Sequence, residues 1–337
     1  MHLTYADRQY FPIGDTNRAT DTDTDTGQRE PLLALLSLLR SQGYDFIAPT
    51  PASQSRVLSR PQRQVGTTLY DLLGWSLPCR RDDLSPDVVA ILEKAGLLEQ
   101  RPDGLVSAGI RVSNVFDQLF VHSRYPTRAQ DSVFLGPDSY RFADYISRNL
   151  SGLTDAARIL DYGAGAGVGG IVAASLHGGA TLTLADINPK ALALASINAT
   201  FAAIDHRTVL ANTPKDVDGD FDLIVTHPPF MIDPDRRAYR DGGDLYGGKL
   251  SLDWTLEAIR KLAPGGRFLM HTGVSIVDGR DVVRDAIDRA MPSVGYRYDY
   301  RVLDPDIFGD ELDKEPYAGV DRIAAIGLCV QRTEERT

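Results

Sequence analysis

The segment Thr226–Phe230, THPPF, places a histidine, two prolines and an aromatic residue directly after the apolar run FDLIV. The prolines stiffen the backbone, so the groups beside them keep a fixed direction. A neutral imidazole offers one acceptor nitrogen and takes up a proton near neutral pH. His227 therefore has two interpretations. It is a base or hydrogen-bond acceptor in a site, or it only satisfies a backbone group at a strand end.

A second informative segment is the glycine-rich stretch DYGAGAGVGG, which begins at Asp161, the end of another apolar run. Glycines let the backbone approach a ligand, and the following helix offers free N–H groups. Asp186 ends the next apolar run, TLTLAD, where its carboxylate either accepts both hydroxyls of a ribose or caps the helix after it. A glycine-rich turn alone is weak, because dinucleotide-binding folds share it. The D-x-G-x-G-x-G spacing followed by Asp186 favours ribose binding.

Alternating strands and helices are expected to position these segments. From residue 131 onward, apolar runs of strand length are separated by helical patterns, which predicts an α/β fold with a parallel sheet covered by helices on both faces. No helical pattern separates the last two runs, so they are expected to close the sheet as an antiparallel hairpin around an acidic loop. The predicted strands are 157–163, 180–187, 207–212, 221–227, 266–272, 296–304 and 321–332.

The N-terminal part is expected to be mostly helical. We assign residues 1–64 to a helical extension in which 20–27, TDTDTDTG, form a mobile loop. Its aspartates are a weak calcium candidate, because a flexible repeat lacks a rigid scaffold. The segment PLLALLSLLRSQGY predicts an amphipathic helix that starts at Pro31 and stops at Gly43.

Residues 65–130 show two helical patterns and then a hairpin with its turn at Asp103–Gly104, an order typical of a winged helix. A winged helix would suggest DNA binding. The second helical pattern, SPDVVAILEKAGLL, has only one lysine against two acids, which is poor equipment for phosphates. We therefore interpret this region as a winged-helix-like cap or substrate domain, before a catalytic domain at 131–337.

Composition narrows the class of protein further. The net charge of −10 disfavours nucleic acid as the principal partner, since phosphate binding relies on clustered Lys and Arg. No run approaches the roughly 20 apolar residues that span a bilayer, and the N-terminus lacks a secretion signal. Cys79 and Cys329 fit neither a metal site nor a disulfide framework. A cytoplasmic protein without metal or membrane partner is expected, and its oligomeric state stays open.

Residues 131–331 resemble class I S-adenosylmethionine-dependent methyltransferases, in particular the small-domain group with glutamine N5-methyltransferases and some rRNA guanine methyltransferases. The resemblance rests on the D-x-G-x-G-x-G series, Asp186 and the Pro-Pro-aromatic motif, in that order. It implies a Rossmann-like seven-stranded sheet with a reversed last hairpin and S-adenosyl-L-methionine as cofactor. The cofactor-binding residues that it implies are Ser139, Asp161, Gly163, Gly165, Gly167, Asp186, Ile187, Asn212, His227 and Pro228.

Two positions depart from the pattern of these families. Their motif reads Asn, Asp or Ser before Pro-Pro-Tyr/Phe; the polar side chain and the first proline carbonyl hold a planar NH₂, and the aromatic ring stacks on it. Here His227 replaces the Asn, so a clamp on two hydrogens is doubtful, and Phe230 would orient the nucleophile. Tyr162 is a bulky residue inside the glycine turn. It either contacts the sulfonium through its ring or packs on a neighbouring helix.

These features give four functional hypotheses. The first is a methyltransferase acting on a small molecule or peptide side chain, with His227, Phe230 and Tyr162 as catalytic residues. The second is a cyclase in which the cofactor's own α-amine attacks its γ-carbon, giving azetidine-2-carboxylate and methylthioadenosine. The third is methylation of rRNA or another nucleic acid, with 65–122 as the reader. The fourth is an inactive cofactor-binding regulator.

Overall fold

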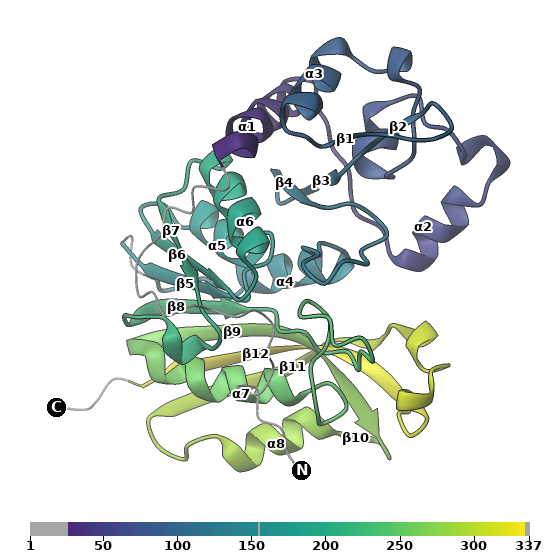
Figure 1. Ribbon diagram of the computed structural model, residues 1–337. Helices are drawn as coiled ribbons and strands as arrows, with labels where there is room; N and C mark the ends of the chain where they lie inside the picture. The colour runs from purple at the N-terminus through teal and green to yellow at the C-terminus, as the bar shows by residue number, and fades with distance from the viewer. Residues whose placement is uncertain (1–25, 154–155, 334–337) are drawn as a thin grey trace.

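The computed structural model describes residues 26–153 and 156–333, which form a central sheet with an N-terminal cap above it (Figure 1). The strand order is β11-β12-β9-β8-β5-β6-β7, and a two-residue strand, β10 (Arg280–Asp281), pairs with β9. The strands β9, β8, β5, β6 and β7 run parallel to one another, whereas β12 is antiparallel to both of its neighbours. The strands are β5 (Arg158–Tyr162), β6 (Thr181–Asp186), β7 (His206–Leu210), β8 (Phe221–Thr226), β9 (Leu262–Val277), β11 (Tyr296–Ile307) and β12 (Arg322–Arg332).

This sheet confirms the predicted α/β fold class, including the antiparallel closing hairpin. Its central strands are mostly apolar because both of their faces are covered. Ile159 of β5 packs into the cluster under one layer of helices, and its neighbour Leu160 packs into the cluster under the other. One layer contains α4 (Pro137–Ser147), α5 (Val168–Leu176) and α6 (Pro189–Phe201); the other contains α7 (Lys249–Ala258) and α8 (Val282–Ala290).

The cap is built from short elements around buried leucines. The hairpin predicted at Asp103–Gly104 is confirmed, since β1 and β2 pair antiparallel on either side of that turn. A second hairpin, β3–β4, follows it and was not predicted. The cap elements are α1 (Thr26–Ser41), α2 (Pro51–Leu58), the π-helical turn Tyr70–Gly74, α3 (Pro86–Lys94), β1 (Leu98–Gln100), β2 (Val106–Ala108), β3 (Ile110–Val115) and β4 (Gln118–Ser123).

The predicted helix start at Pro31 is wrong, because α1 begins at Thr26 and Pro31 lies inside it. The additional turn is held by side chains: Gln28 donates to the carbonyl of Ala95, and Arg29 donates to hydroxyls on α6. These contacts offset the backbone bond that a proline removes. Residues 20–25 of the predicted mobile loop lie outside the described residues, while Thr26 and Gly27 belong to the helix.

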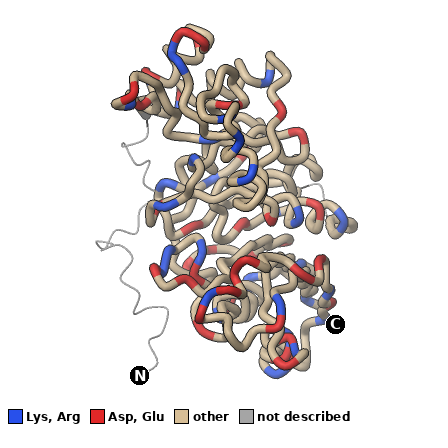
Figure 2. Tube along the Cα trace, turned by 90° about the vertical axis from the view of Figure 1, so that its right-hand side faces the viewer, with Lys and Arg blue, Asp and Glu red and all other residues tan. Residues whose placement is uncertain are grey.

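Helix α1 packs against both α3 of the cap and α6 of the sheet layer. One apolar cluster runs from Leu32 through Val112 to Leu184, so the N-terminal helix shares its core with the elements on either side. The division into three domains and the winged-helix assignment stay predictions. Figure 2 shows basic and acidic residues interspersed in both halves of the described chain.

Candidate functional site

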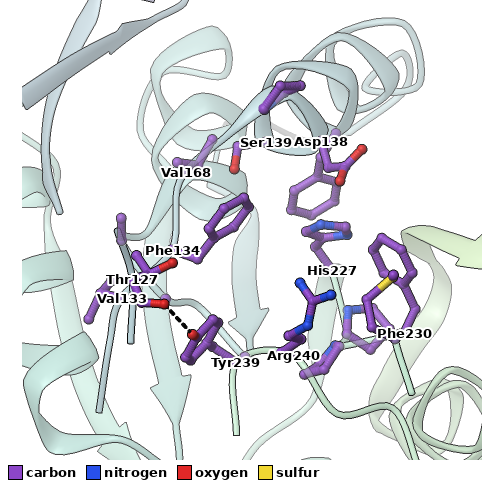
Figure 3. Close-up of a pocket in the computed structure, with 18 of the residues that line it drawn as sticks. Thr127, Val133, Phe134, Asp138, Ser139, Val168, His227, Phe230, Tyr239 and Arg240 are labelled. Carbon is purple, nitrogen blue, oxygen red and sulfur yellow. Dashed lines mark hydrogen bonds between the residues drawn. The ribbon is translucent and has the colours of Figure 1, made fainter. Parts of the chain in front are cut away.

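A cavity of about 540 Å³ lies at the carboxyl ends of β5, β6 and β8, the edge of a parallel sheet where ligands bind. Its wall includes the glycine turn, the THPPF segment, the start of α4 and residues 50–52 of the cap. Two long loops complete it, one between β8 and α7 and one between β11 and β12. Figure 3 shows Ser139, Asp138 and Val168 along one side of this cavity and Tyr239, Arg240 and Phe230 along the other. Segments more than 200 residues apart in sequence thus meet around one space.

The glycine turn presents its backbone to the cavity. Gly163 and Gly165 have φ values of +68° and +54°, a left-handed conformation that side chains disfavour. A Cβ at Gly163 would lie 2.7 Å from the Trp254 ring, whereas a Cβ at Gly165 would meet open space. The Gly165 N–H donates to Asp186 Oδ2 at 2.9 Å. Asp186 at the end of β6 therefore fixes the glycine turn that follows β5. Gly165 is the point of this turn where a ligand can approach the backbone.

Asp161 and Asp186 are both buried at neighbouring strand ends. Asp161 Oδ2 accepts the Gly170 N–H at 2.7 Å, which ties α5 to β5, and Asp186 Oδ1 accepts the Asn188 N–H at 2.8 Å. Burial raises the pKa of Asp161 to about 8, with a further contribution from Asp186. Burial also raises the pKa of Asp186. Both residues belong to the cavity wall, so their carboxyl groups can form hydrogen bonds with a ligand there.

The raised pKa of Asp161 predicts how stability depends on pH. The folded state binds this proton more tightly than the unfolded state, so its contribution to stability is lost as pH rises from about 4 to about 8. Asp161→Asn keeps an oxygen for Gly170 but cannot titrate. We expect the free energy of unfolding of the wild type to fall more steeply from pH 5 to pH 8, by at most about 1.4 kcal/mol per pH unit relative to the variant. Urea titrations of both proteins measure this, and parallel curves would contradict it.

His227 has a defined tautomer. Its Nδ1 lies 2.8 Å from the carbonyl oxygen of His271, and a carbonyl only accepts, so Nδ1 carries the hydrogen. Burial lowers the pKa of His227, opposed by Asp138, so the neutral ring is favoured. Its other nitrogen, Nε2, then carries the lone pair. The ring lies in the cavity wall (Figure 3), and among the described residues none donates to Nε2. The backbone contact accounts for Nδ1, and the role of Nε2 as base or acceptor stays a prediction.

His271 is a residue that sequence reasoning missed. It lies on β9, is fully buried, and places its Nδ1 3.2 Å from Nδ1 of His227. Because His227 donates from that nitrogen, His271 accepts and carries its own hydrogen on Nε2, which has no partner within the described chain. Burial and the neighbouring His227 hold the pKa of His271 well below its usual value. The sequence offered one signal for it: His271 is a polar residue near the end of the apolar run GRFLMHT, the predicted strand that follows FDLIVTH along the chain.

The aromatic candidates divide between cavity and core. Phe230 lines the cavity, with its ring 5.7 Å from that of His227 and close above Gly273 of β9. Tyr162 also borders the cavity, but its ring packs edge-on against Trp254 of α7 at 4.6 Å and is 2% exposed. Its described ring contact is that of a core residue, and a contact with the sulfonium stays a prediction.

Most, but not all, predicted cofactor residues surround the cavity. Ser139, Ile187 and Pro228 line it together with the residues described above. Gly167 and Asn212 do not: Gly167 is the N-cap residue before α5, and Asn212 is exposed beyond the end of β7. The expected place of Asn212 at an adenine edge stays a prediction, and β7, the strand before it, is the outermost strand on that side of the sheet.

Sequence reasoning also missed the charged part of the wall. Arg237, Arg240 and Glu311 line the cavity from the two long loops. Loops carry no periodic pattern, so only the acidic run 304–315 gave any signal. Across the described ranges, no helix is long and apolar enough to cross a membrane, and no three acidic, His or Cys side chains are grouped to hold a metal ion.

Comparison with known proteins gives one family. Residues 143–239 match the family model described as "Methyltransferase small domain". A release factor glutamine methyltransferase of Agrobacterium fabrum is 33% identical over 248 residues, which cover 68% of this chain and 81% of that protein. Its counterpart in Deinococcus radiodurans is 30% identical over 164 residues, 46% of this chain and 55% of the relative.

Other similarities are more local. A ribosomal RNA small subunit methyltransferase C of Serratia proteamaculans is 43% identical over 75 residues, 22% of this chain and 21% of that protein. This chain thus spans about half the length of the Deinococcus relative and a fifth of the Serratia one. A solved SAM-dependent methyltransferase from Agrobacterium tumefaciens has 15% identity and a TM-score of 0.43, covering 68% of this chain and 71% of that one.

Proposed function

This chain belongs to the class I S-adenosylmethionine-dependent methyltransferases, and from that premise we propose that it methylates a small molecule or a peptide side chain held at His227. The observation that carries the proposal is the direction of the His227 ring. Nδ1–H is committed to the backbone of β9, so Nε2 is an acceptor at the cavity wall, beside the glycine turn.

The residues present fit the cofactor. Gly165 leaves open space beside its backbone, and Asp186 is fixed next to it with carboxylate lone pairs to spare for a ribose. Bound S-adenosylmethionine would supply an electrophilic methyl group. The protein's own contribution is to orient the acceptor and exclude water, since displacement at that carbon depends mainly on alignment. Nε2 of His227 takes up the proton that the methylated group loses. Phe230 restricts the orientation of that group from the neighbouring side.

The choice of acceptor class rests on the shape of the site. Residues 50–52 of the cap and residues 306–311 both contribute to the wall, which suits a compact group entering the cavity. Relatives named for protein and for rRNA substrates are both similar to this chain, so the expected exclusion of nucleic acid has no support from them. Replacement of the Asn by His227 favours an acceptor that presents one hydrogen rather than an amide NH₂.

The first experiment is mass spectrometry of the purified protein incubated with S-adenosylmethionine in four parallel reactions. One contains no acceptor, one a glutamine-containing release-factor peptide, one a small-molecule extract, and one a small-subunit rRNA fragment. S-adenosylhomocysteine formed only with the peptide or the extract would support methyl transfer and decide between the two acceptor classes. Formation with the glutamine peptide would contradict the preference for an acceptor with one hydrogen. A rate that rises only with the rRNA fragment would overturn the proposal in favour of nucleic acid.

A second candidate is intramolecular cyclisation, favoured by one observation: His227 supplies a single acceptor where the amide clamp of related motifs needs two. The cofactor's α-amine would form a bond to its γ-carbon while the bond from that carbon to sulfur breaks. The electron pair stays on sulfur as methylthioadenosine, and the amine proton passes to Nε2. Methylthioadenosine with an equal amount of azetidine-2-carboxylate in the reaction without acceptor would establish it, and an unconsumed cofactor would exclude it.

A further inference from the structure

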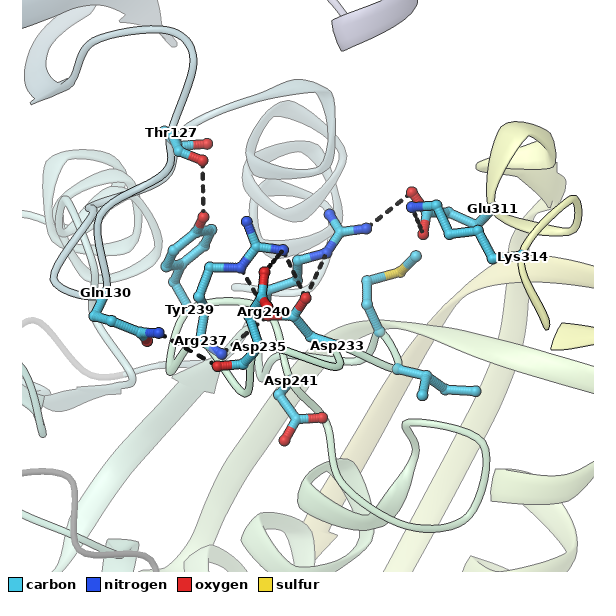
Figure 4. Close-up of polar contacts among 12 residues, drawn as sticks. Thr127, Gln130, Asp233, Asp235, Arg237, Tyr239, Arg240, Asp241, Glu311 and Lys314 are labelled. Atoms are coloured by element: carbon cyan, nitrogen blue, oxygen red, sulfur yellow. Dashed lines mark hydrogen bonds and ion pairs between the residues drawn. The ribbon is translucent and has the colours of Figure 1, made fainter. Parts of the chain in front are cut away.

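Two arginines stand at the cavity wall, in the loop that follows THPPF. Arg237 and Arg240 both line the cavity, as does Glu311 from the loop between β11 and β12 (Figure 4). Tyr239, between them in sequence, donates its hydroxyl hydrogen to the carbonyl of Thr127 at 3.0 Å. This bond fixes the loop against the segment that leads out of the cap, so the arginines have defined positions.

Each of the two sheltered acids near Arg240 also has another cation as a partner. Asp233 is 2% exposed and accepts from both Nε and an Nη of Arg237, at 2.8 and 2.6 Å. Arg240 is farther away, with Nε 3.8 Å from Asp233. Its direct partner is Glu311 at 2.8 Å, and Glu311 is also bound by Lys314 at 2.6 Å.

Glu311 therefore has two cation partners, Arg240 and the half-exposed Lys314. Asp233, the other sheltered acid, is held chiefly by Arg237. Two other acids in the same loop do not bind Arg240 directly. Asp235 is 74% exposed and 3.8 Å from Arg237, so solvent screens it. Asp241 points away from the guanidinium groups (Figure 4) and accepts the Gly243 N–H.

The side chain of Arg240 is placed toward the reacting side of the cavity. In Figure 3 the guanidinium of Arg240 extends toward His227, with Phe230 beside it. Phe308, which packs against Phe230 at 5.8 Å, makes the surroundings still less polar. A cation in such surroundings is costly unless an anion meets it. Guanidinium groups match the two oxygens of a carboxylate in a fork geometry.

We propose that Arg240 is the carboxylate-binding residue of this site and that Glu311 is its exchangeable counter-ion. The proposal rests on the proposed function and names a feature of its substrate, a carboxylate within reach of the group at His227. When that carboxylate binds, Arg240 leaves Glu311, which keeps Lys314 as its partner. The carboxylate has two sources of the same chemistry: the acceptor, or the amino-acid end of the cofactor.

The test uses binding, so it does not depend on finding the acceptor. Calorimetry with S-adenosylhomocysteine and with its decarboxylated analogue reports on the cofactor's carboxylate. Butyrate and uncharged butyramide, each titrated into protein saturated with S-adenosylhomocysteine, report on a carboxylate of the methyl acceptor. The proteins are the wild type, Arg240→Gln and Glu311→Gln. Thermal melting confirms that each variant is folded.

Arg240→Gln is expected to lower the affinity for one of the two carboxylate ligands, S-adenosylhomocysteine or butyrate, by about 10- to 100-fold. The uncharged counterpart of that ligand should bind as it does to the wild type. A change with S-adenosylhomocysteine assigns the carboxylate to the cofactor, and a change with butyrate assigns it to the acceptor. Glu311→Gln should shift the same ligand in the opposite direction, toward tighter binding, because it removes the internal competitor.

Unchanged affinities of both carboxylates in Arg240→Gln would overturn the proposal, as would equal losses for butyrate and butyramide. Failure of the proposed function looks different. In that case wild-type protein binds these ligands as described but forms neither S-adenosylhomocysteine nor methylthioadenosine from S-adenosylmethionine under any acceptor condition.

Discussion

Replacing His227 by alanine is expected to slow the consumption of S-adenosylmethionine by about 100- to 10,000-fold, the usual contribution of a positioned base. The reason is the orientation of the ring. Nδ1–H is bound to the carbonyl of His271, and this leaves the lone pair of Nε2 as the acceptor that the THPPF segment presents to the cavity. The rate is measured as formation of whichever cofactor product the wild type makes.

The pH profile distinguishes a base from a packing residue. Burial lowers the pKa of His227 below its ordinary value of about 6.5, and the neutral form is the active one. The wild-type rate should therefore be constant above pH 6.5 and fall only at lower pH. His227→Asn restores an oxygen acceptor but cannot take a proton, so it should lose this acidic limb together with most of the rate.

Two controls show whether the loss comes from the missing base at the acceptor. The affinity for S-adenosylhomocysteine should change little in His227→Asn if the residue acts on the acceptor rather than on the cofactor. His177→Ala, at the far end of α5 and outside the cavity wall, should retain the full rate. Unchanged product yield in His227→Asn would rule out the role as base.

The strands were predictable because burial on both faces leaves a continuous apolar run in the sequence. Their carboxyl ends follow directly, so Asp161, Asp186 and His227 could be assigned to one edge of the sheet from the order of the runs alone. The length of β9 was not predictable. It continues past the predicted end at residue 272 to Val277, because β12 pairs with it as far as Ile276 and β10 pairs with Val277.

The charged wall of the cavity shows where sequence reasoning stops. Arg240 and Glu311 are 71 positions apart, in loops without periodicity, and only the fold of the two loops brings them to 2.8 Å. His271 was hidden for a different reason, since a single polar residue in an apolar strand is equally compatible with a satisfied core position. Asn212 stays a prediction: it lies outside the cavity wall, and its side chain is exposed.

Replacing Asp186 by alanine is expected to lower the affinity for S-adenosylhomocysteine by on the order of 100-fold or more. Two effects act in the same direction. A charged acceptor for two ribose hydroxyls is removed, and hydrogen bonds to a charged group are worth roughly 1.5–3 kcal/mol each. The Gly165 N–H also loses its partner at 2.9 Å, so the glycine turn is no longer fixed against β6. Calorimetry measures the change.

Asp186→Asn separates these two effects. An amide still offers an oxygen to Gly165 or Asn188, so the turn is largely kept, but the amide lacks the charge and the second acceptor oxygen. Ribose binding predicts that most of the affinity is lost in Asp186→Asn with little change in melting temperature. The helix-cap interpretation is wrong, because Asn188 caps α6. A purely structural role of Asp186 at Gly165 and Asn188 predicts the reverse, a lower melting temperature with nearly normal affinity. The exposed Asp205, before β7, serves as the matched control: Asp205→Asn should alter neither quantity. Because the two interpretations move different quantities, one pair of measurements decides whether Asp186 holds the cofactor or only the turn beside it.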